Sequence, residues 1–517
     1  MDKPVKLRLN RKDDMASSGK RHDFEVKYSV GFNKKGKIKG LDITLLSNAG
    51  NVCDLSAPVM SRALTHLDNC YSFKDFTARG YICKTNTVSN TAFRGFGGPQ
   101  GMLAIETILE RVSRFLGIDL DALRRENYYS PKNGIKTPYG QIVKNIKIEK
   151  IINEMETFAG LEKRKLLVER FNTSQINKNQ PYRKGIAFMP AKFGISFNKV
   201  SLNQAGALVH VYTDGSVRLN HGGTEMGQGL FIKVAQVVSE CFNIPIDYVH
   251  ISGTNTDEVP NTSATAASSG SDINGMAAWK AATVIKQRML KHASKVFKKP
   301  PSSIEFKNGL ILSGNKSMTF KELAFSCWEN RISLSSTGFY KTPKISWDQE
   351  KFKGSPYFYF TWGAAVSEAI IDIDTGESRI LRADIIQDCG SSLNPLIDRG
   401  QIEGGFIQGI GWLTCEELYF NPEGKLLTLG PSTYKIPGSR DVPPEFNIKL
   451  LENTPNEEKT IFRSKAVGEP PLLLSISHFL ALKNAVSMAS ETSNADLLNA
   501  PATPSKILAA VHNDHSM

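Results

Sequence analysis

The sequence predicts an α+β protein of two lobes, in which antiparallel hairpin sheets pack against helices and one unit is loosely duplicated. Three observations predict this class. The chain of 517 residues, with 40% hydrophobic and 22% charged residues, is long and apolar enough for several folding units with large cores. Alternating apolar and polar residues flank glycine-containing turns, as in β-hairpins. A glycine-rich loop and an amphipathic helix follow each larger hairpin.

The hairpins are predicted from their turns. Alternating residues flank turns at 33–36, 214–215 and 375–376, and a smaller hairpin turns at 423–424. Asp214-Gly215 carries the strongest signal, because aspartate and glycine tolerate the left-handed backbone of a two-residue turn. Hairpins imply antiparallel sheets with helices laid on them. The spacing of the units is long and irregular, which excludes a solenoid.

Five helices are predicted from apolar residues that recur at helical spacing. They cover residues 102–115, 230–241, 271–297, 401–412 and 473–489. The third is expected to have Asp272 near its N-cap.

The polar stretch over 161–183 predicts the division between lobes, because it interrupts the apolar periodicity. We therefore expect a first lobe over 1–160, a linker over 161–183 and a second lobe over 184–517.

The chain carries a formal net charge of +13 at pH 7, with a pI near 9.2. Such an excess suits nucleic acid, an acidic partner or an anionic ligand. The lysines are scattered, and their densest run, over 291–299, is typical of the polar end of one helix. No nucleic-acid motif and no interleaving of aromatic and basic residues is seen. A solvated lysine-rich surface is the favoured interpretation.

Cysteine usage and the apolar stretches indicate a cytoplasmic protein. Seven widely spaced cysteines contain no CxxC motif, which argues against a disulfide framework, a structural zinc site and an iron–sulfur cluster on this chain. A reducing compartment fits best. The charged N-terminus shows no signal peptide, and the most apolar stretch, 472–488, is too short and too polar to span a membrane.

Three loops are candidates for binding an anion. Glycines or other small residues crowd the loops over 94–101, 221–229 and 265–271, each before a predicted helix. Exposed backbone N–H groups and the positive end of a helix attract phosphate. The first loop misses the GxGxxG spacing by one residue, so a tight structural turn is an equal alternative for that loop alone. Together the three favour an extended phosphorylated ligand held between lobes, with His221 in a structural role.

The loop over 467–471 holds a candidate general base. Glu469 precedes two prolines, which restrict its backbone and push it towards extended geometry. A carboxylate held rigidly beside an apolar helix suits proton abstraction. Taken alone, a surface turn is the more common meaning of such a glutamate.

Six motifs, in this order, resemble the xanthine dehydrogenase/aldehyde oxidase family of molybdenum hydroxylases, and in particular the C-terminal part of the large molybdopterin-binding subunit of its bacterial members. They are FRGFGGPQGM, HGGTEMGQGL, NTSATAASSGSD, DCGSSLNP, GQIEGG and SKAVGEPPL. The resemblance covers residues 5–511 and implies an internally duplicated fold that binds the molybdenum cofactor, molybdopterin.

The resemblance also implies roles for individual residues. Glu469 would be the catalytic base, which removes a proton from the water-derived oxygen that attacks the substrate. Arg94 and Ala267 would lie beside the molybdenum, with no protein side chain bound directly to it. The residues implied to hold the cofactor are Arg94, Gly95, Gly97, Met226, Gln228, Ala267, Ser268 and Gln401.

Four residues are implied to contact the substrate. Phe96 and Phe197 would sandwich a flat ring, which suits a purine. Arg62 matches an arginine that purine-oxidising members use, and a cation there would stabilise negative charge that develops on the purine. Asn198 stands where relatives often have Thr or Ser. The implied reaction is hydroxylation of hypoxanthine or xanthine towards urate, with an aldehyde oxidase-type reaction as the alternative.

Electrons must leave the molybdenum, so the resemblance implies a partner chain with iron–sulfur clusters and FAD that reduces NAD, in a dimer of heteromers. No nucleic-acid or membrane partner is expected. The family's upstream GGGFGGKE-type loop and second substrate glutamate have no match in residues 1–60. We therefore expect an N-terminally truncated subunit, and a non-catalytic remnant is the second hypothesis.

Overall fold

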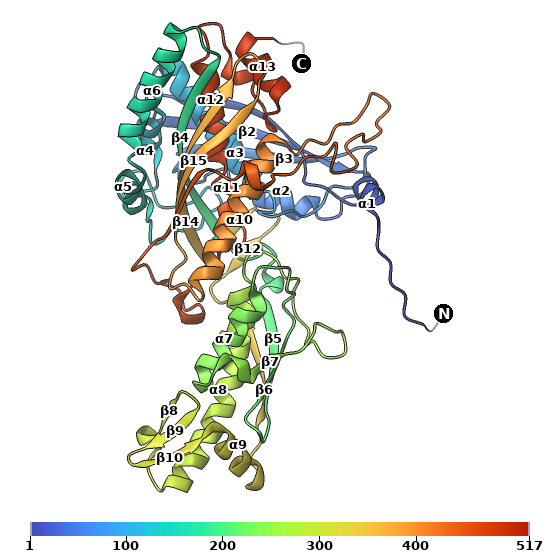
Figure 1. Ribbon diagram of the computed structural model, residues 1–517, viewed down its shortest axis with the longest axis vertical. Helices are drawn as coiled ribbons and strands as arrows, with labels where there is room; N and C mark the ends of the chain where they lie inside the picture. Colours follow the sequence, from blue (N-terminus) through green and yellow to red (C-terminus); the bar gives the residue numbers. More distant parts are fainter. Residues whose placement is uncertain (1–2, 515–517) are drawn as a thin grey trace.

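Five sheets and thirteen α-helices are found in residues 3–514, which the computed structural model describes (Figure 1). The helices are α1 (Arg11–Ser17), α2 (Ser56–Leu64), α3 (Gly98–Leu116), α4 (Leu120–Asn127), α5 (Ile148–Ala159), α6 (Leu161–Asn177), α7 (Leu230–Phe242), α8 (Gly270–Phe297), α9 (Phe320–Glu329), α10 (Pro395–Thr414), α11 (Pro470–Leu473), α12 (Ile476–Ser487) and α13 (Pro504–His512). The strands are β1 (Phe24–Phe32), β2 (Ile38–Gly50), β3 (Asp75–Lys84), β4 (Tyr182–Ile195), β5 (Gln204–Val211), β6 (Val217–His221), β7 (Val249–Ile251), β8 (Glu305–Lys307), β9 (Leu310–Ser313), β10 (Lys316–Thr319), β11 (Ser335–Lys341), β12 (Ser346–Asp348), β13 (Lys353–Ser355), β14 (Tyr359–Asp372), β15 (Ser378–Gln387) and β16 (Glu445–Leu450).

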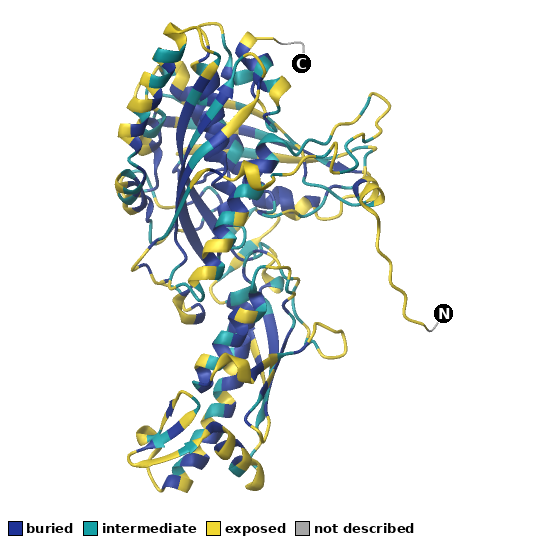
Figure 2. Ribbon diagram, in the orientation of Figure 1, coloured by how far each residue is buried: buried dark blue, intermediate teal, exposed yellow. Residues whose placement is uncertain are grey.

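Strands β4 and β14 form the centre of the larger body and are buried on both faces for most of their length (Figure 2). They pair antiparallel along all fourteen residues, in a sheet of order β16-β15-β14-β4. Side chains alternate between the faces of a strand. Met189 and Phe193 therefore join one core, with α12, while Phe188 joins the other, with α5. This sheet has a helical layer on each side.

One folding unit occurs three times, as the sequence suggested. In β1-β2-α2-β3, β5-β6-α7-β7 and β14-β15-α10-β16, an antiparallel hairpin is followed by a helix and a third strand that pairs parallel with the second. The predicted hairpins around 33–36, 214–215 and 375–376 are confirmed, and so is the α+β class. The parallel third strands were not predicted, so these sheets are mixed rather than purely antiparallel.

The helix of the first unit is α2, not the helix expected over 102–115. That helix exists as α3, but it follows the completed unit. Sequence periodicity missed α2 because it buries Ser56, Ser61 and Arg62 beside its apolar residues. The predicted helices over 230–241, 271–297 and 401–412 lie within α7, α8 and α10, and the last corresponds to α11 and α12, with a break before Ile476 and an end at Ser487.

The lobes divide differently from the sequence-based boundaries. One hydrophobic core draws only on buried residues between 205 and 340 and fills the lobe built on β5, β6, β7, β11, α7 and α8 (Figure 1). The two cores of the larger body combine residues from both sides of the expected 161–183 linker. Most of that segment is helix α6, which packs on β4 through Val168 and Asn172. A polar sequence therefore marks a half-exposed helix here, not a free linker.

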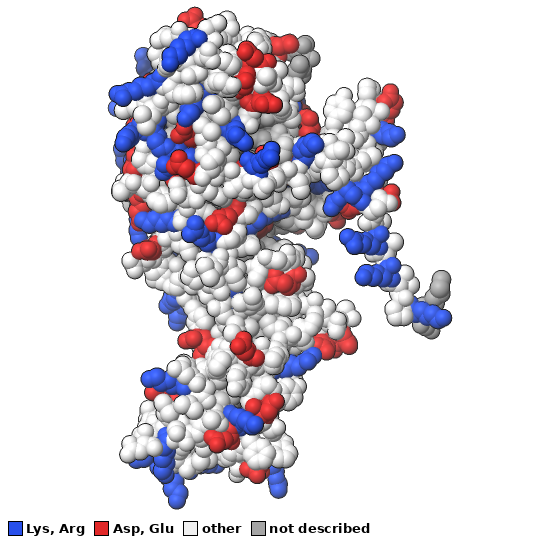
Figure 3. Space-filling model, viewed as in Figure 1, with Lys and Arg blue, Asp and Glu red and all other residues white. Residues whose placement is uncertain are grey.

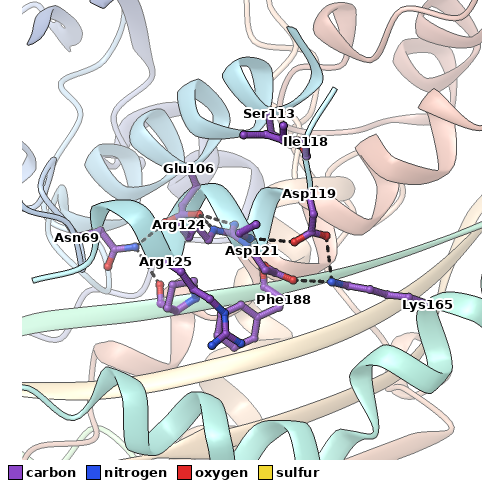
Figure 4. Close-up of polar contacts among 12 residues, drawn as sticks. Asn69, Glu106, Ser113, Ile118, Asp119, Asp121, Arg124, Arg125, Lys165 and Phe188 are labelled. Carbon is purple, nitrogen blue, oxygen red and sulfur yellow. Dashed lines mark hydrogen bonds and ion pairs between the residues drawn. The ribbon is translucent and has the colours of Figure 1, made fainter. Parts of the chain in front are cut away.

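A buried ion pair fastens α3 and α4 to β4 (Figure 4). Arg124 Nη2 donates to Glu106 Oε2 (2.5 Å) and Arg124 Nη1 to the carbonyl of Phe188 (2.6 Å), and both charged side chains are fully buried. The second carboxylate oxygen, Oε1, accepts hydrogen bonds from Asn69 and Tyr71. Asn69 also donates to the carbonyl of Pro190 on β4. Every charge in this network therefore has a partner, as burial requires.

The surface charges, the cysteines and the hydrophobicity of the helices can be compared with what the sequence indicated. On the face shown in Figure 3, basic and acidic side chains are mixed over the body rather than gathered in one patch. All seven cysteines are unpaired. Within residues 3–514, no helix combines the length and hydrophobicity that a membrane span needs.

We predict that Glu106→Gln lowers the free energy of unfolding by about 3 kcal/mol, because it leaves the buried Arg124 charge without its carboxylate. Asp42→Asn is the control, because it removes only an exposed ion pair with Arg79 and is expected to cost at most about 1 kcal/mol. Urea unfolding of both variants measures the difference. Equal losses would contradict the role given to the buried pair.

Candidate functional site

A cavity of about 580 Å³ lies where loops from distant parts of the chain meet. It is walled by the loop before α3, the loops before α7 and α8, one side of α10 and the segment 464–469. Eight of the residues expected from the sequence line it, namely Arg94, Phe96, Met226, Gln228, Ala267, Ser268, Gln401 and Glu469.

Glu469 is held in the cavity wall at both carboxylate oxygens. The hydroxyl of Ser268 donates to Oε2 (2.8 Å), and the backbone N–H of Gly95 donates to Oε1 (3.3 Å). Glu469 N–H in turn donates to Ser268 Oγ (2.8 Å). The Glu469 backbone (φ −95°, ψ −40°) is helical rather than extended as expected before proline, because it caps α11. The carboxylate is therefore held in place by groups of the chain itself.

Arg94 joins three segments with one guanidinium group. Its Nε donates to the carbonyl of Gly468 (2.5 Å), Nη2 to the carbonyl of Gln401 (3.2 Å) and Nη1 to Gln408 Oε1 (3.2 Å). Burial lowers the pKa of Arg94, and the nearby charge of Glu469 partly offsets this. Three of its five N–H groups therefore tie the cavity walls together, and Arg94 itself lines the cavity.

Two glycines of the first loop, Gly95 and Gly97, make different contacts. Gly95 has φ +90° and presents its N–H to Glu469. Gly97 has φ +97°, and a Cβ there would lie 2.1 Å from the carbonyl oxygen of Val59 on α2. Gly97 does not line the cavity, so the structural alternative considered from the sequence describes it better than cofactor contact.

The loop before α7 satisfies its own N–H groups. Glu225 Oε1 accepts from Gly227 (2.8 Å) and Gly229 (3.0 Å), and Oε2 accepts from Phe231 (3.0 Å). Burial would raise the pKa of Glu225, but these hydrogen bonds outweigh it and the pKa is lowered. A carboxylate of the chain therefore already accepts from three N–H groups that the sequence analysis expected to be available to a ligand anion.

Gln228 and Met226 lie on the cavity side of the same loop. Gln228 Oε1 accepts from the N–H of Met226 (2.5 Å), which shapes the loop, and the Met226 side chain is 67% exposed. His221 is buried and its Nδ1 accepts from Gly223 N–H, in keeping with a structural role.

The start of α8 is the remaining candidate, among the three loops, for binding an anion. Ala267 (φ +56°) and Ser268 (φ +55°) take the left-handed backbone that non-glycine residues rarely adopt, and they turn the chain into the helix at Gly270. No side chain caps this 28-residue helix, and its first-turn N–H groups have no helical partner. Gly270 and Ser271 line the cavity, so the positive end of α8 faces it.

Arg62, Phe197 and Asn198 form a second group, which does not line this cavity. Arg62 is buried and donates to the carbonyls of Gly194 (2.9 Å) and Ser196 (2.5 Å) at the end of β4. Asn198 Nδ2 donates to Ser61 Oγ (3.1 Å), next to Arg62 on α2. The group lies behind the first glycine loop, because α2 packs directly on Gly97.

Sequence reasoning missed four buried charged residues in the cavity wall, namely Asp272, Lys465 and the ion pair of Lys233 and Asp398. Asp272 lies in the first turn of α8, where acidic residues are common, so nothing in the sequence distinguished it; the N-cap is Ser269. Burial raises the pKa of Asp272 to about 7, against the opposing effects of a hydrogen bond from Tyr359 and the charge of Lys233. Lys465 precedes the Glu469 turn and pairs with Asp388 (2.6 Å).

Comparison with known proteins identifies the kind of domain. Family models described as a molybdopterin cofactor-binding domain match residues 1–128 and 155–443. The chain is 47% identical to a xanthine dehydrogenase/oxidase of Gallus gallus, 46% to one of Felis catus and 44% to a xanthine dehydrogenase of Dictyostelium discoideum. Each match covers 98% of this chain and 36% of the relative. The chain thus spans little more than a third of these relatives.

Solved structures share the fold at low identity. A Cu,Mo-CO dehydrogenase superposes with a TM-score of 0.85 and 20% identity, over 98% of this chain and 64% of its own. An aldehyde oxidoreductase of Desulfovibrio desulfuricans gives 0.79 and 22%, over 98% and 50%. The mixed arrangement of sheets and helices described above therefore occurs both in a carbon monoxide dehydrogenase and in an aldehyde oxidoreductase.

We predict that Asp272→Asn changes how stability depends on pH. A carboxyl whose pKa rises from 3.8 to about 7 on folding favours the folded state at low pH, and this contribution is lost as pH rises from about 4 to 7. The loss is at most about 4 kcal/mol. Urea unfolding should therefore show that the variant gains stability relative to the unmodified chain between pH 5 and pH 8. A difference that does not change with pH would contradict the burial of an ionisable Asp272.

Proposed function

Because this chain belongs to the xanthine dehydrogenase/aldehyde oxidase family of molybdenum hydroxylases, we propose that it is the molybdopterin-binding catalytic portion of a xanthine dehydrogenase. The reaction replaces a C–H bond of hypoxanthine or xanthine with C–OH, towards urate. The oxygen comes from water, and two electrons and two protons leave. The observation that carries this proposal is the carboxylate of Glu469, which is fixed at both oxygens in the wall of the cavity.

The residues of the cavity fit a phosphorylated pterin cofactor. The uncapped start of α8 offers N–H groups and a positive helix end to a phosphate. Ala267, Ser268 and Gln401 would hold the cofactor, with Met226 covering it from the loop before α7. When bound, molybdenum supplies the redox centre that takes up the two electrons.

Glu469 acts as the general base. Its Oε1 receives the proton of the water-derived oxygen as that oxygen attacks the substrate carbon, because the hydrogen bond from Gly95 to Oε1 is the longer of its two. Ser268 keeps Oε2 in place, so the carboxylate does not reorient during the reaction. Preorganisation of this kind lets the base act without a costly rearrangement of the site.

The substrate class is proposed from the named relatives and the second group of residues. Phe96 lines the cavity, and Arg62, Phe197 and Asn198 lie together behind the first glycine loop. Asn198 Oδ1 is buried in this group without a hydrogen-bond partner in the described structure. We propose a purine site that extends from the cavity to this group. An aldehyde oxidase-type reaction is the alternative, because the fold occurs in an aldehyde oxidoreductase.

The electrons need an acceptor beyond the residues described. We propose iron–sulfur clusters and FAD that reduce NAD, carried by a partner chain or by further parts of a longer protein, in a cytoplasmic dimer of heteromers. The support is that the xanthine dehydrogenase relatives are almost three times as long as the stretch they share with this chain. A non-catalytic remnant of such a subunit is the competing hypothesis.

We predict that Glu469→Gln in the complete, cofactor-loaded enzyme lowers kcat by at least about 100-fold, because a general base contributes 10²–10⁴-fold. The amide keeps an acceptor for Ser268, so molybdenum content per chain should not change. Xanthine oxidation and metal analysis of the same preparation measure both. Substantial residual activity at full molybdenum content would refute the assignment of Glu469 as the general base.

We predict that Arg62→Ala lowers kcat/KM for xanthine at least about tenfold more than kcat/KM for an aromatic aldehyde, because only the purine develops charge that a cation stabilises. The ratio is insensitive to partial loss of folded protein, which affects both substrates equally. Equal losses of kcat/KM on the two substrates would show that Arg62 acts only through its contacts to Gly194 and Ser196. The argument from Arg62 for a purine substrate would then fail.

A further inference from the structure

Two links join the stretch 267–272 to the segment 466–469, and the second involves residues that the proposed mechanism does not use. In the first link, Ser268 contacts Glu469 directly. In the second, Tyr359 on β14 stands between the two stretches. Its O–H donates to Asp272 Oδ2 (2.7 Å), and its oxygen accepts the N–H of Ala466 (3.0 Å).

We propose that Asp272 and Tyr359 are positioning residues for Glu469, acting through the backbone of Ala466. Ala466 lies three residues before Glu469, and Asp272 lies four residues after Ser268 on the other side of the cavity. The two links are therefore neighbours that connect the same two segments, and together they fix both the position and the direction of the segment that carries the carboxylate.

The surroundings of Tyr359 make this link specific. Tyr359 is buried, and its hydroxyl has one proton, which goes to Asp272, so Ala466 N–H must be the donor to its oxygen. Further along the segment, Arg94 holds the carbonyl of Gly468. Losing the hydroxyl leaves a buried N–H at Ala466 without an acceptor, and such a group is costly to leave unpaired.

The link is strongest when Asp272 is ionised, because a hydrogen bond to a charged acceptor is stronger than one to a neutral carboxyl. The groups that face Asp272 are Lys233 on α7, Tyr340 on β11 and Tyr359 on β14. Lys233 also forms an ion pair with Asp398 of α10. Because Lys233 is shared with Asp398, its positive charge only partly offsets the effect of burial on Asp272. Burial raises the pKa of Asp272 to about 7, so the link weakens as pH falls through neutrality.

The test uses the complete cofactor-loaded enzyme with Tyr359→Phe, which removes only the hydroxyl. We expect kcat for xanthine to fall about tenfold, with KM within twofold and molybdenum content unchanged. Independently of activity, we expect faster hydrogen exchange of the Ala466 amide by mass spectrometry. Tyr340→Phe is the matched control, because this buried tyrosine also faces Asp272 but no hydrogen bond joins its hydroxyl to 466–469; both measurements should stay unchanged.

Asp272→Asn gives a second test that does not depend on how Tyr359→Phe folds. The amide oxygen still accepts from Tyr359 but is neutral at every pH, so the fall in kcat with an apparent pKa near 7 should disappear, and kcat at pH 8 should drop to the level that the unmodified enzyme shows well below pH 7. A retained step near pH 7, or Tyr359→Phe with unchanged kcat and unchanged Ala466 exchange, overturns the proposal.

The inference rests on the proposed function, and the two can fail separately. If the unmodified loaded enzyme does not oxidise xanthine, the proposed function is wrong. Exchange at Ala466 in Tyr359→Phe and Tyr340→Phe still decides whether the hydroxyl holds the segment.

Discussion

The guanidinium of Arg94 is the interaction on which the site depends. It lies in the first glycine loop and holds the carbonyls of Gly468 and Gln401, which are more than 300 positions away in the sequence. Hydrogen bonds from a planar guanidinium to backbone carbonyls fix both the distance and the relative orientation of the segments that they join. A single ion pair would fix only the distance between two charges. Because Arg94 is half-buried, these bonds are partly shielded from water. The cavity exists because this residue ties its walls together.

This constraint explains how groups of the chain itself orient the Glu469 carboxylate. The same loop that carries Arg94 supplies the N–H of Gly95 to Glu469, and the loop before α8 supplies the hydroxyl of Ser268. The left-handed backbone at Ala267 and Ser268 is unfavourable locally and persists because the surrounding contacts compensate for it. The lobe with its own core contributes α8 and its open end, while the larger body contributes Arg94 and Glu469. The site therefore belongs to the contact between them.

Local signals predicted most of the fold, and family motifs predicted most of the cavity wall. Turns such as Asp214-Gly215 and the apolar stripe of α3 are short-range features, so the sequence shows them directly. Parallel pairing of the third strand in each unit depends on long-range contacts and leaves no local pattern. The 161–183 segment looked like a linker because polarity alone does not distinguish a half-exposed helix. Three features depend on contacts between residues that are distant in the sequence or on the folded shape of a loop, and a single sequence does not show these contacts. They are the hydrogen bonds from the loop N–H groups to Glu225, the packing of Gly97 on α2 and the link through Tyr359.

The most direct test of the central claim is a crystal structure of the complete loaded enzyme, with anomalous scattering at the molybdenum edge to locate the metal. The account predicts that the anomalous peak lies inside the cavity enclosed by the loops before α3, α7 and α8. The Glu469 carboxylate should face the peak while it keeps its hydrogen bond to Ser268. A peak outside this cavity, or a Glu469 side chain turned towards bulk solvent, would contradict the account.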